Sequence, residues 1–443
     1  MASPLLALVG VLAAGPLVWG PTLSGAHVDA MMTKIVNDEA RVLAAARGLA
    51  LARPLVVRVL DRAHLAAERE SLQQKSRSSE EARGEDALWG ALGLGAPHAA
   101  TPATADVTGI YDVVQKRLLL GNWEPLAAGT FARTRDIAQA LLDDRFQVGR
   151  WLRDIARETD DGVQSDVALA RQALWEGDAT IQTLERTSQT GTLPPTRALR
   201  MQIEALRQTI TDESPGSPPL ALARRLVVQL DGTTFVATAR ARFPWSAVDR
   251  MWARPPASTE QILHPDRYER GDAPDDVGGR LPRRWSPAWR VAFADTLGEL
   301  GVRAFLLRAV GDYRAERAAM GWGGDRAILF RQQGKGDAVA PTEFVVWVTT
   351  WDGITDAQDF AEQASVSLTA LAGAPVEKVV TRSRRAVPRR WRGLDAKGRL
   401  FALEERGRAV GMLVGAPPEA ESFLAKLMTA ALRPGGGHGR AHD

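Results

Sequence analysis

The sequence predicts a protein of the α+β class, with a mainly helical central domain that contains a small sheet, followed by a small α+β domain. Two patterns support this class. Residues 28–251 carry several long stretches whose apolar residues recur at helical spacing. After Glu343 the chain instead carries short runs of branched and aromatic residues, which are typical of strands. Its 443 residues, 45% of them hydrophobic, are enough for two or three domains with their own cores.

The first 26 residues are predicted to be a targeting segment. Residues 4–19 form an apolar run that is shorter than the roughly 20 residues a transmembrane helix needs, and small residues follow it up to Ala26. We therefore expect a secretory signal peptide cleaved after Ala26, which would export the protein to the periplasm. The first basic residue is Lys34, so the usual basic start of a signal is missing. An uncleaved membrane anchor and a buried helix are the alternatives.

Residues 27–106 are expected to form a helix–strand–helix unit with a linker. The elements in order are a helix over 28–47, a strand over 55–60, a helix from Arg62 that continues through the charged residues 71–85, and a loop over 95–105.

The central domain is expected over residues 107–335. It starts with a β-hairpin made by residues 108–112 and 117–120. The helices expected after it cover residues 135–146, 165–185, 197–211 and 222–251.

The C-terminal α+β domain is expected over residues 336–433. Its elements are a strand over 344–351, a helix over 357–371, strands over 398–404 and 409–414 joined by a hairpin turn, and a helix ending near Leu432. The remaining tail, 434–443, is rich in glycine and is expected to be flexible. His438 and His442 are the only two histidines at metal-ligand spacing, and a glycine-rich tail holds no preformed site.

Composition excludes several classes of function. The formal net charge is +3, and the basic residues are spread along the chain, unlike the clustered footprint of a nucleic-acid-binding protein. The densest basic cluster runs from Arg382 to Arg392, and we interpret it as a solvated loop, with an anionic partner as the alternative. The absence of cysteine excludes disulfides, thiolate metal sites, cysteine nucleophiles and a lipoprotein anchor.

Residues 135–146, which read R-D-I-A-Q-A-L-L-D-D-R-F, carry a resemblance to a known family. They resemble the central helix, H-E-L-T-H-A-L-Q-D-Q-H-F, of a family of bacterial, usually exported, zinc metallopeptidase-like proteins of the HExxH (gluzincin) type. In that alignment the two histidine ligands fall on Arg135 and Gln139, and the glutamate base falls on Asp136. The residues at the two ligand positions and at the base position are all changed, while the apolar residues around them are kept.

Other stretches extend this resemblance over residues 44–365. Residues 254–265, R-P-P-A-S-T-E-Q-I-L-H-P, match a family signature closely, and residues 108–112, 295–301 and 321–326 match further stretches. The stretch E-G-D-A at Glu176 resembles the one that supplies the family's third zinc ligand. The resemblance therefore implies a zincin-like central domain in which one ligand of three survives.

The changed residues predict that the family's zinc site is degenerate. Zinc needs neutral imidazoles, thiolates or carboxylates. Arg135 is a permanent cation without a lone pair, Gln139 offers a poor amide ligand, and Asp136 is shorter than the glutamate that would activate water. We therefore expect no metal, no cofactor and no catalytic residue. If Glu176 is left without a metal, Arg135 is expected within about 4 Å of it as a substitute cation. The alternative is that Arg135 points to solvent.

Five more residues are candidates for the wall of a substrate-like cleft. Tyr111 lies in the hairpin, whose edge strand holds extended peptide in the family resembled here. The others, Ser258, Thr259, Glu260 and His264, lie in the signature stretch. Their simpler interpretation is structural, with a helix cap at Ser258 and a loop hydrogen bond from His264. A Ser258–His264 catalytic triad lacks a nucleophile-elbow pattern, and the glycines at 321–324 are expected to form a tight turn rather than a phosphate cradle.

These observations favour a catalytically inactive, metallopeptidase-like protein of the cell envelope that binds a peptide or protein partner. Nucleic acid is not expected as a partner, and membrane attachment through the N-terminal segment is the alternative to a cleaved signal. The rival functions are an active hydrolase with rearranged ligands, such as Asp136, Glu176 and Asp178 around a metal, and a structural envelope protein without a cleft.

Overall fold

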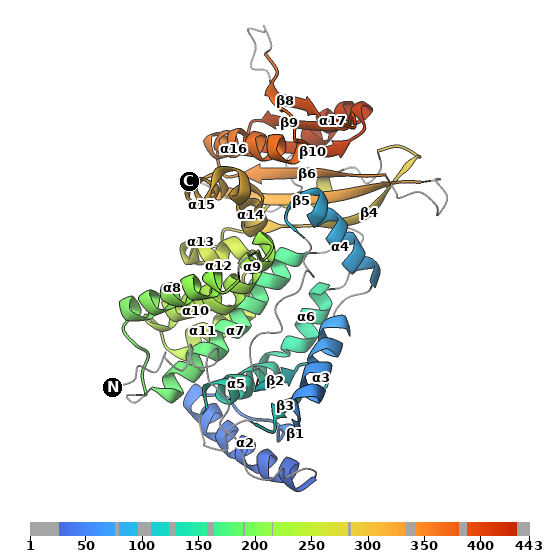
Figure 1. Ribbon diagram of the computed structural model, residues 1–443. Coiled ribbons are helices and arrows are strands. Elements are labelled where there is room, and N and C mark those ends of the chain that lie inside the picture. Colours follow the sequence, from blue (N-terminus) through green and yellow to red (C-terminus); the bar gives the residue numbers. More distant parts are fainter. Residues whose placement is uncertain are drawn as a thin grey trace.

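The structure is a computed structural model that combines a long helical region with a seven-stranded sheet (Figure 1). It describes residues 26–75, 79–95, 108–123, 130–156, 164–188, 191–214, 216–281, 285–333, 342–380 and 388–431. The predicted α+β class is confirmed. The predicted signal segment up to residue 25, the tail 434–443 and the arginines at 382–385 lie outside the described residues.

A small three-stranded sheet forms one end of the helical region. Its strands are β1 (Val56–Leu60), β2 (Gly109–Asp112) and β3 (Arg117–Gly121), in the order β1-β3-β2. Strand β1 runs parallel to β3, and β2 and β3 form the predicted antiparallel hairpin. Helix α2 (Ala26–Arg47) lies along β1, and α3 (Arg62–Lys75) contacts all three strands.

Helix α7 (Ser165–Thr187) is the central element of the helical region, and it packs against α5 (Phe131–Phe146) and α10 (Gly232–Arg240). The contact with α10 is very close, because a Cβ atom added to Gly177 would lie 2.2 Å from the Gly232 carbonyl oxygen. Only glycine permits such an approach of two backbones. The other elements of this region are α4 (Ser79–Ala91), α6 (Val148–Ala156), α8 (Thr196–Asp212), α9 (Pro219–Leu226), the π-helical turn η1 (Val227–Asp231), α11 (Trp245–Ala253), α12 (Thr259–Leu263) and α13 (Pro265–Arg270).

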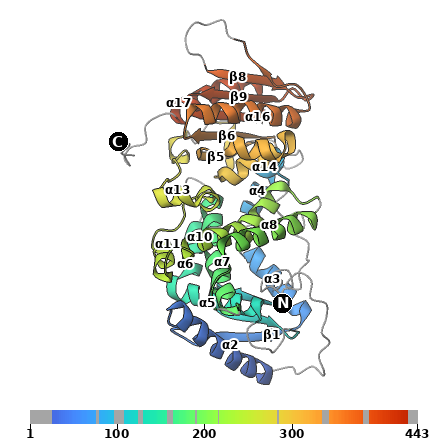
Figure 2. The same cartoon turned by 90° about the vertical axis from the view of Figure 1, so that its left-hand side faces the viewer.

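The large sheet has the strand order β4-β5-β6-β10-β9-β8-β7, and all neighbours in it are antiparallel. Its strands are β4 (Trp289–Asp295), β5 (Trp322–Gln332), β6 (Glu343–Trp351), β7 (Glu377–Lys378), β8 (Arg389–Leu394), β9 (Leu400–Arg406) and β10 (Ala409–Ala416). Helix α16 (Ile354–Ala372) packs in the core on one face and α17 (Glu421–Ala431) in the core on the other. Two shorter helices, α14 (Gly298–Val310) and α15 (Asp312–Ala319), follow β4 and lie between the sheet and the helical region (Figures 1 and 2).

The sheet begins earlier in the chain than the sequence predicted. Strands β4 and β5 belong to it, so the boundary predicted between residues 335 and 336 falls inside the sheet. The glycines at 321–324 do not form an isolated turn but lead into β5, where Gly324 would place a Cβ only 2.6 Å from the Asp275 carbonyl oxygen. In the part of the chain that the structure describes, no helix is both long and apolar enough to span a membrane.

Candidate functional site

The four residues that the family resemblance aligns with a zinc site lie together where α5 crosses α7. Arg135 and Gln139 are one helical turn apart on α5, and both face Glu176 on α7. The Arg135 guanidinium lies 3.4 Å from Glu176 Oε1, and the Gln139 side-chain amide donates to Glu176 Oε2 at 2.5 Å. The expected pairing of Arg135 with Glu176 is therefore confirmed. The charge of Glu176 raises the pKa of Arg135, so the arginine stays a cation here.

Asp136 joins this group from the opposite side of Arg135. Its Oδ1 accepts a hydrogen bond from the Arg135 guanidinium at 3.3 Å, and its side chain is buried. A Cβ on Gly109 would lie 2.7 Å from Asp136 Oδ2, so the carboxylate packs directly against the backbone of β2. Arg135 thus pairs with two carboxylates, those of Glu176 and Asp136.

No residue set in this site matches a metal centre. The described residues contain no group of three or more histidine, cysteine, aspartate or glutamate side chains placed to hold a metal ion. The rearranged set of Asp136, Glu176 and Asp178 is not brought together, because Asp178 is buried against Arg47.

Tyr111 is a buried residue of the hairpin rather than an open cleft residue. Its hydroxyl donates to Asp143 Oδ2 at 2.7 Å, and its ring meets Trp175 edge-on. Burial raises the pKa of Tyr111, and the charge of Asp143 raises it further, so the hydroxyl keeps its proton. The Trp175 indole in turn donates to the Gln139 carbonyl, which ties the hairpin to α5 and α7.

The signature stretch, residues 254–265, contacts α7 at a different position from Arg135 and Gln139. Thr259 binds Asp166, which is ten residues before Glu176 and therefore about 15 Å away along the helix axis. The side chains of Ser258, Thr259 and Glu260 are buried, so they do not line a cleft with Arg135. Ser258 is the N-cap of α12 and accepts from the Gln261 amide at 3.3 Å, as its capping interpretation predicts.

His264 and Glu260 are held by separate charged partners. The His264 imidazole lies 3.0 Å from the buried Glu299 carboxylate, and this hydrogen bond raises the pKa of His264. The expected hydrogen bond from His264 to its own loop is therefore wrong. His264 instead bonds to Glu299 of α14. Burial raises the pKa of Glu260 to about 9 although Arg267 lies 3.4 Å away.

Sequence reasoning missed a buried network around Asp178. Arg47 of α2 donates to both Asp178 oxygens, at 3.4 and 3.1 Å, and also pairs with Asp249 of α11 at 2.8 Å. The indole of Trp252 and the amide of Gln182 complete the hydrogen bonds to Asp178. The E-G-D-A stretch drew attention to Glu176, and no sequence pattern links Asp178 to a residue 131 positions earlier.

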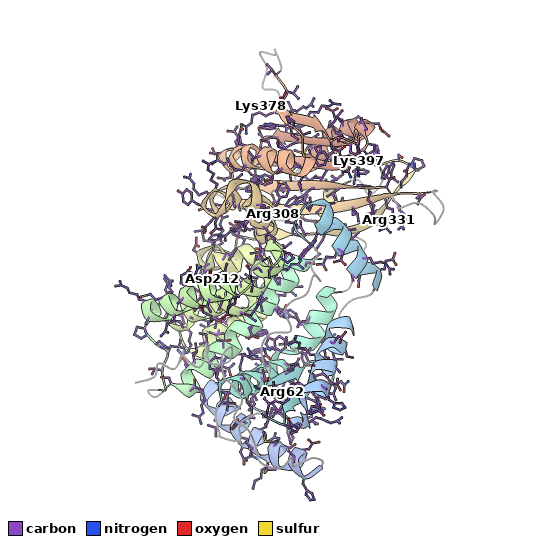
Figure 3. The ribbon with its side chains drawn as sticks, viewed as in Figure 1. Arg62, Asp212, Arg308, Arg331, Lys378 and Lys397 are labelled. Carbon is purple, nitrogen blue, oxygen red and sulfur yellow. The ribbon has the colours of Figure 1, made fainter. Side chains whose placement is uncertain are left out.

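The basic strand β8 is largely neutralised by acidic residues. Arg389 pairs with Glu405 at 2.5 Å, and Arg390 pairs with Glu404 at 2.8 Å, both across the β8–β9 ladder. Lys378, at the outer edge of the sheet in Figure 3, pairs with Glu362. This arrangement supports a solvated, charge-balanced face.

The comparison with known proteins gives a match for the sheet region only. A family model described as "Domain of unknown function (DUF8575)" matches residues 289–425, which run from the first residue of β4 into α17. The matched segment is therefore the seven-stranded sheet with its helices. The comparisons with curated proteins and with solved structures give no match.

Proposed function

We propose that this chain is a catalytically inactive, metallopeptidase-like protein of the cell envelope that binds a peptide or protein partner. The observation that carries the proposal is the Arg135–Glu176 pair, with Gln139 as a second donor to the same carboxylate. An arginine at this position neutralises the glutamate as a metal would, but it cannot coordinate a water molecule and activate it as a nucleophile. In this proposal α5 and α7 keep the arrangement of the family's zinc-binding helices, while the residues that would bind zinc and activate water are replaced.

The hairpin supports the binding part of the proposal. Strand β2 is an edge strand of the small sheet and lies beside α5. The opposite edge, β1, is occupied, because Asn37 and Asp29 of α2 bind the backbone of Leu55 and Val59. An extended segment would therefore add more readily to β2 than to β1, through backbone hydrogen bonds.

The first experiment measures metal. The purified full-length protein should contain no stoichiometric zinc in metal analysis and should not degrade an unstructured substrate such as casein. The triple variant Arg135→His, Asp136→Glu, Gln139→His should gain zinc through Glu176, and the same variant with Glu176→Gln should not. Stoichiometric zinc in the unchanged protein, lost on Glu176→Gln, would favour the active hydrolase instead.

The second experiment looks for the partner. A photo-crosslinking residue placed at Ile110 of β2 should capture a partner in cells, whereas the same residue at the exposed Val56 of β1 should not. Equal labelling from both positions, or none from Ile110, would favour a structural envelope protein without a binding edge.

A further inference from the structure

Three buried aspartates lie between the N-terminal end of α7 and the large sheet. Asp166 comes from α7, Asp295 from the end of β4 and Asp325 from β5, and their exposed fractions are 3%, 0% and 3%. They are referred to below as the aspartate joint.

Each aspartate of the joint binds the start of a helix. Asp295 accepts from the Ser165 amide of α7 at 2.9 Å, which links the sheet directly to the helical region. Asp325 accepts from the amides of Leu297 and Gly298 at the start of α14, at 3.0 and 2.9 Å.

Asp166 binds the start of α12. Its two oxygens accept from the Thr259 amide and hydroxyl, at 3.1 and 2.5 Å. Through these hydrogen bonds the three carboxylates of the joint hold α7, α12 and α14 together.

The joint has no spare room. Gly298 has a φ of +72°, and a Cβ added there would lie 1.9 Å from Asp166 Oδ1. The backbone at the start of α14 therefore rests directly on the Asp166 carboxylate. A change in the charge of Asp166 therefore alters the contact between the helical region and the sheet.

Cations only partly balance the joint. Arg224 of α9 lies 3.9 Å from Asp295 Oδ2, but it also bonds to Glu85 of α4 at 2.8 Å. Arg326 of β5 donates to the Thr296 hydroxyl beside the joint. The Trp347 indole also donates to Asp325 and the Thr296 amide donates to Asp295, while the nearby Glu299 pairs with His264.

Among the described residues, the three carboxylates of the joint face the guanidinium groups of Arg224 and Arg326, and Arg224 also serves Glu85, so negative charge is in excess. A buried unpaired charge is costly, so the joint favours binding a proton. Burial raises the pKa of Asp166 to about 7 and that of Asp325 to about 6, and it raises the pKa of Asp295 as well.

We propose that the aspartate joint is a proton-dependent latch: a proton held among Asp166, Asp295 and Asp325 closes the helical region onto the sheet, and its loss loosens that contact. The direction of the pH dependence follows from the linkage between proton binding and closure. The closed joint holds a proton that the separated carboxylates would release, so closure is favoured at acidic pH and weakens as pH rises through neutrality.

The test is hydrogen–deuterium exchange of the full-length protein at pH 6 and pH 8, corrected for the intrinsic chemical rate. With the Asp166 pKa near 7, the protection of the Ser165, Thr259 and Gly298 amides should fall about tenfold over this range. Amides in the core of α16, far from the joint, should lose no more than about twofold. Equal protection of the joint amides at both pH values would overturn the proposal.

Variants assign the effect to the joint. Asp166→Asn cannot ionise but keeps an oxygen that accepts from Thr259, so its protection should be nearly independent of pH. Asp231→Asn removes another carboxyl whose pKa is raised by burial, paired with Arg207 outside the joint, and should keep the tenfold change. If Asp166→Asn does not fold, Asp325→Asn takes its place and should reduce the change. A tenfold change that survives both joint variants, or that disappears in Asp231→Asn, contradicts the proposal.

Discussion

Helix α7 carries two carboxylates two residues apart, and each is paired with an arginine in a different environment. Glu176 meets Arg135 of α5 with 14% and 30% of the two side chains still exposed. Asp178 meets Arg47 of α2 with 0% and 1% exposed. The pairs share their chemistry and their helix, so they differ mainly in burial and in the number of additional hydrogen bonds.

This difference in burial separates the Arg47–Asp178 pair, which is fully enclosed, from the Arg135–Glu176 pair, which is partly exposed. Asp178 has its hydrogen bonds completed by Trp252 and Gln182, and Arg47 also stacks on Trp245 at 4.0 Å. Among the described residues, Glu176 is bound by Arg135 and Gln139, and both side chains of the Arg135–Glu176 pair are partly exposed. The buried pair therefore fastens α2 to α7, whereas the Arg135–Glu176 pair stays partly open to solvent.

The largest effect is expected from Arg47→Ala. Removing this guanidinium leaves the buried Asp178 without its counter-charge, which should lower the free energy of unfolding of the helical region by roughly 3–5 kcal/mol. Guanidinium denaturation followed by circular dichroism measures the change.

The control removes both charges. The double variant Arg47→Met, Asp178→Asn removes the fully buried pair and leaves Asp249, whose side chain is 37% exposed, so it should recover a large part of the loss. A loss below about 1 kcal/mol in Arg47→Ala, as for an exposed pair, would show that the comparison by burial fails here.

A smaller effect is expected from Tyr111→Phe. This variant removes an uncharged hydrogen-bond donor to the buried Asp143 carboxylate and changes no charge. Asp143 would lose its hydrogen bond from the tyrosine hydroxyl, but it would keep the Gly149 amide at 2.7 Å and Lys116 at 3.6 Å. Hydrogen bonds to charged groups contribute about 1.5–3 kcal/mol, so we expect the lower end of that range. A loss as large as that of Arg47→Ala would mean that burial alone, and not the missing counter-charge, sets the cost.

The two pairs also show how far sequence reasoning reaches. The Arg135–Glu176 pair was predictable, because the family resemblance aligned both residues with zinc-ligand positions of that family. The helices at 28–47, 135–146 and 165–185 and the hairpin at 108–120 were predictable too, since periodicity and turn signals are local.

What the sequence did not reveal depends on distant partners. Arg47 looks like an ordinary basic residue near a helix end, and its partner Asp178 is 131 residues away. Strand β5 was missed because its first residues look like a glycine-rich turn, and only the approach of Asp275 explains Gly324. The cleft interpretation of Ser258 and Thr259 failed for the same reason, since Asp166 and Gln261 bind them inside the protein.

Arg135→Ala tests the partly exposed pair. Glu176 would keep the Gln139 amide and some water, so the loss should be about 1–2 kcal/mol, between the values for exposed and buried pairs. The same denaturation experiment measures it, and Arg135→Lys should recover less than half, because a lysine lacks the planar fork that reaches both Glu176 and Asp136. A loss of 3 kcal/mol or more would place this pair with Arg47 and weaken the argument that the site is accessible.

The smallest effect is expected from Arg41→Ala, which removes an arginine that pairs with Asp38 at 2.8 Å one turn earlier on α2. Here 69% and 51% of the two side chains are exposed, so water and salt screen the pair almost completely. The expected loss is under about 0.5 kcal/mol, and it should vanish in 1 M salt, whereas the loss in Arg47→Ala should persist there. The three arginines then form a series in which the loss rises with burial while the pair chemistry stays the same. If Arg41→Ala costs as much as Arg135→Ala, the loss at Arg135 reflects a surface ion pair alone, and the group around Glu176 has no special place in the fold.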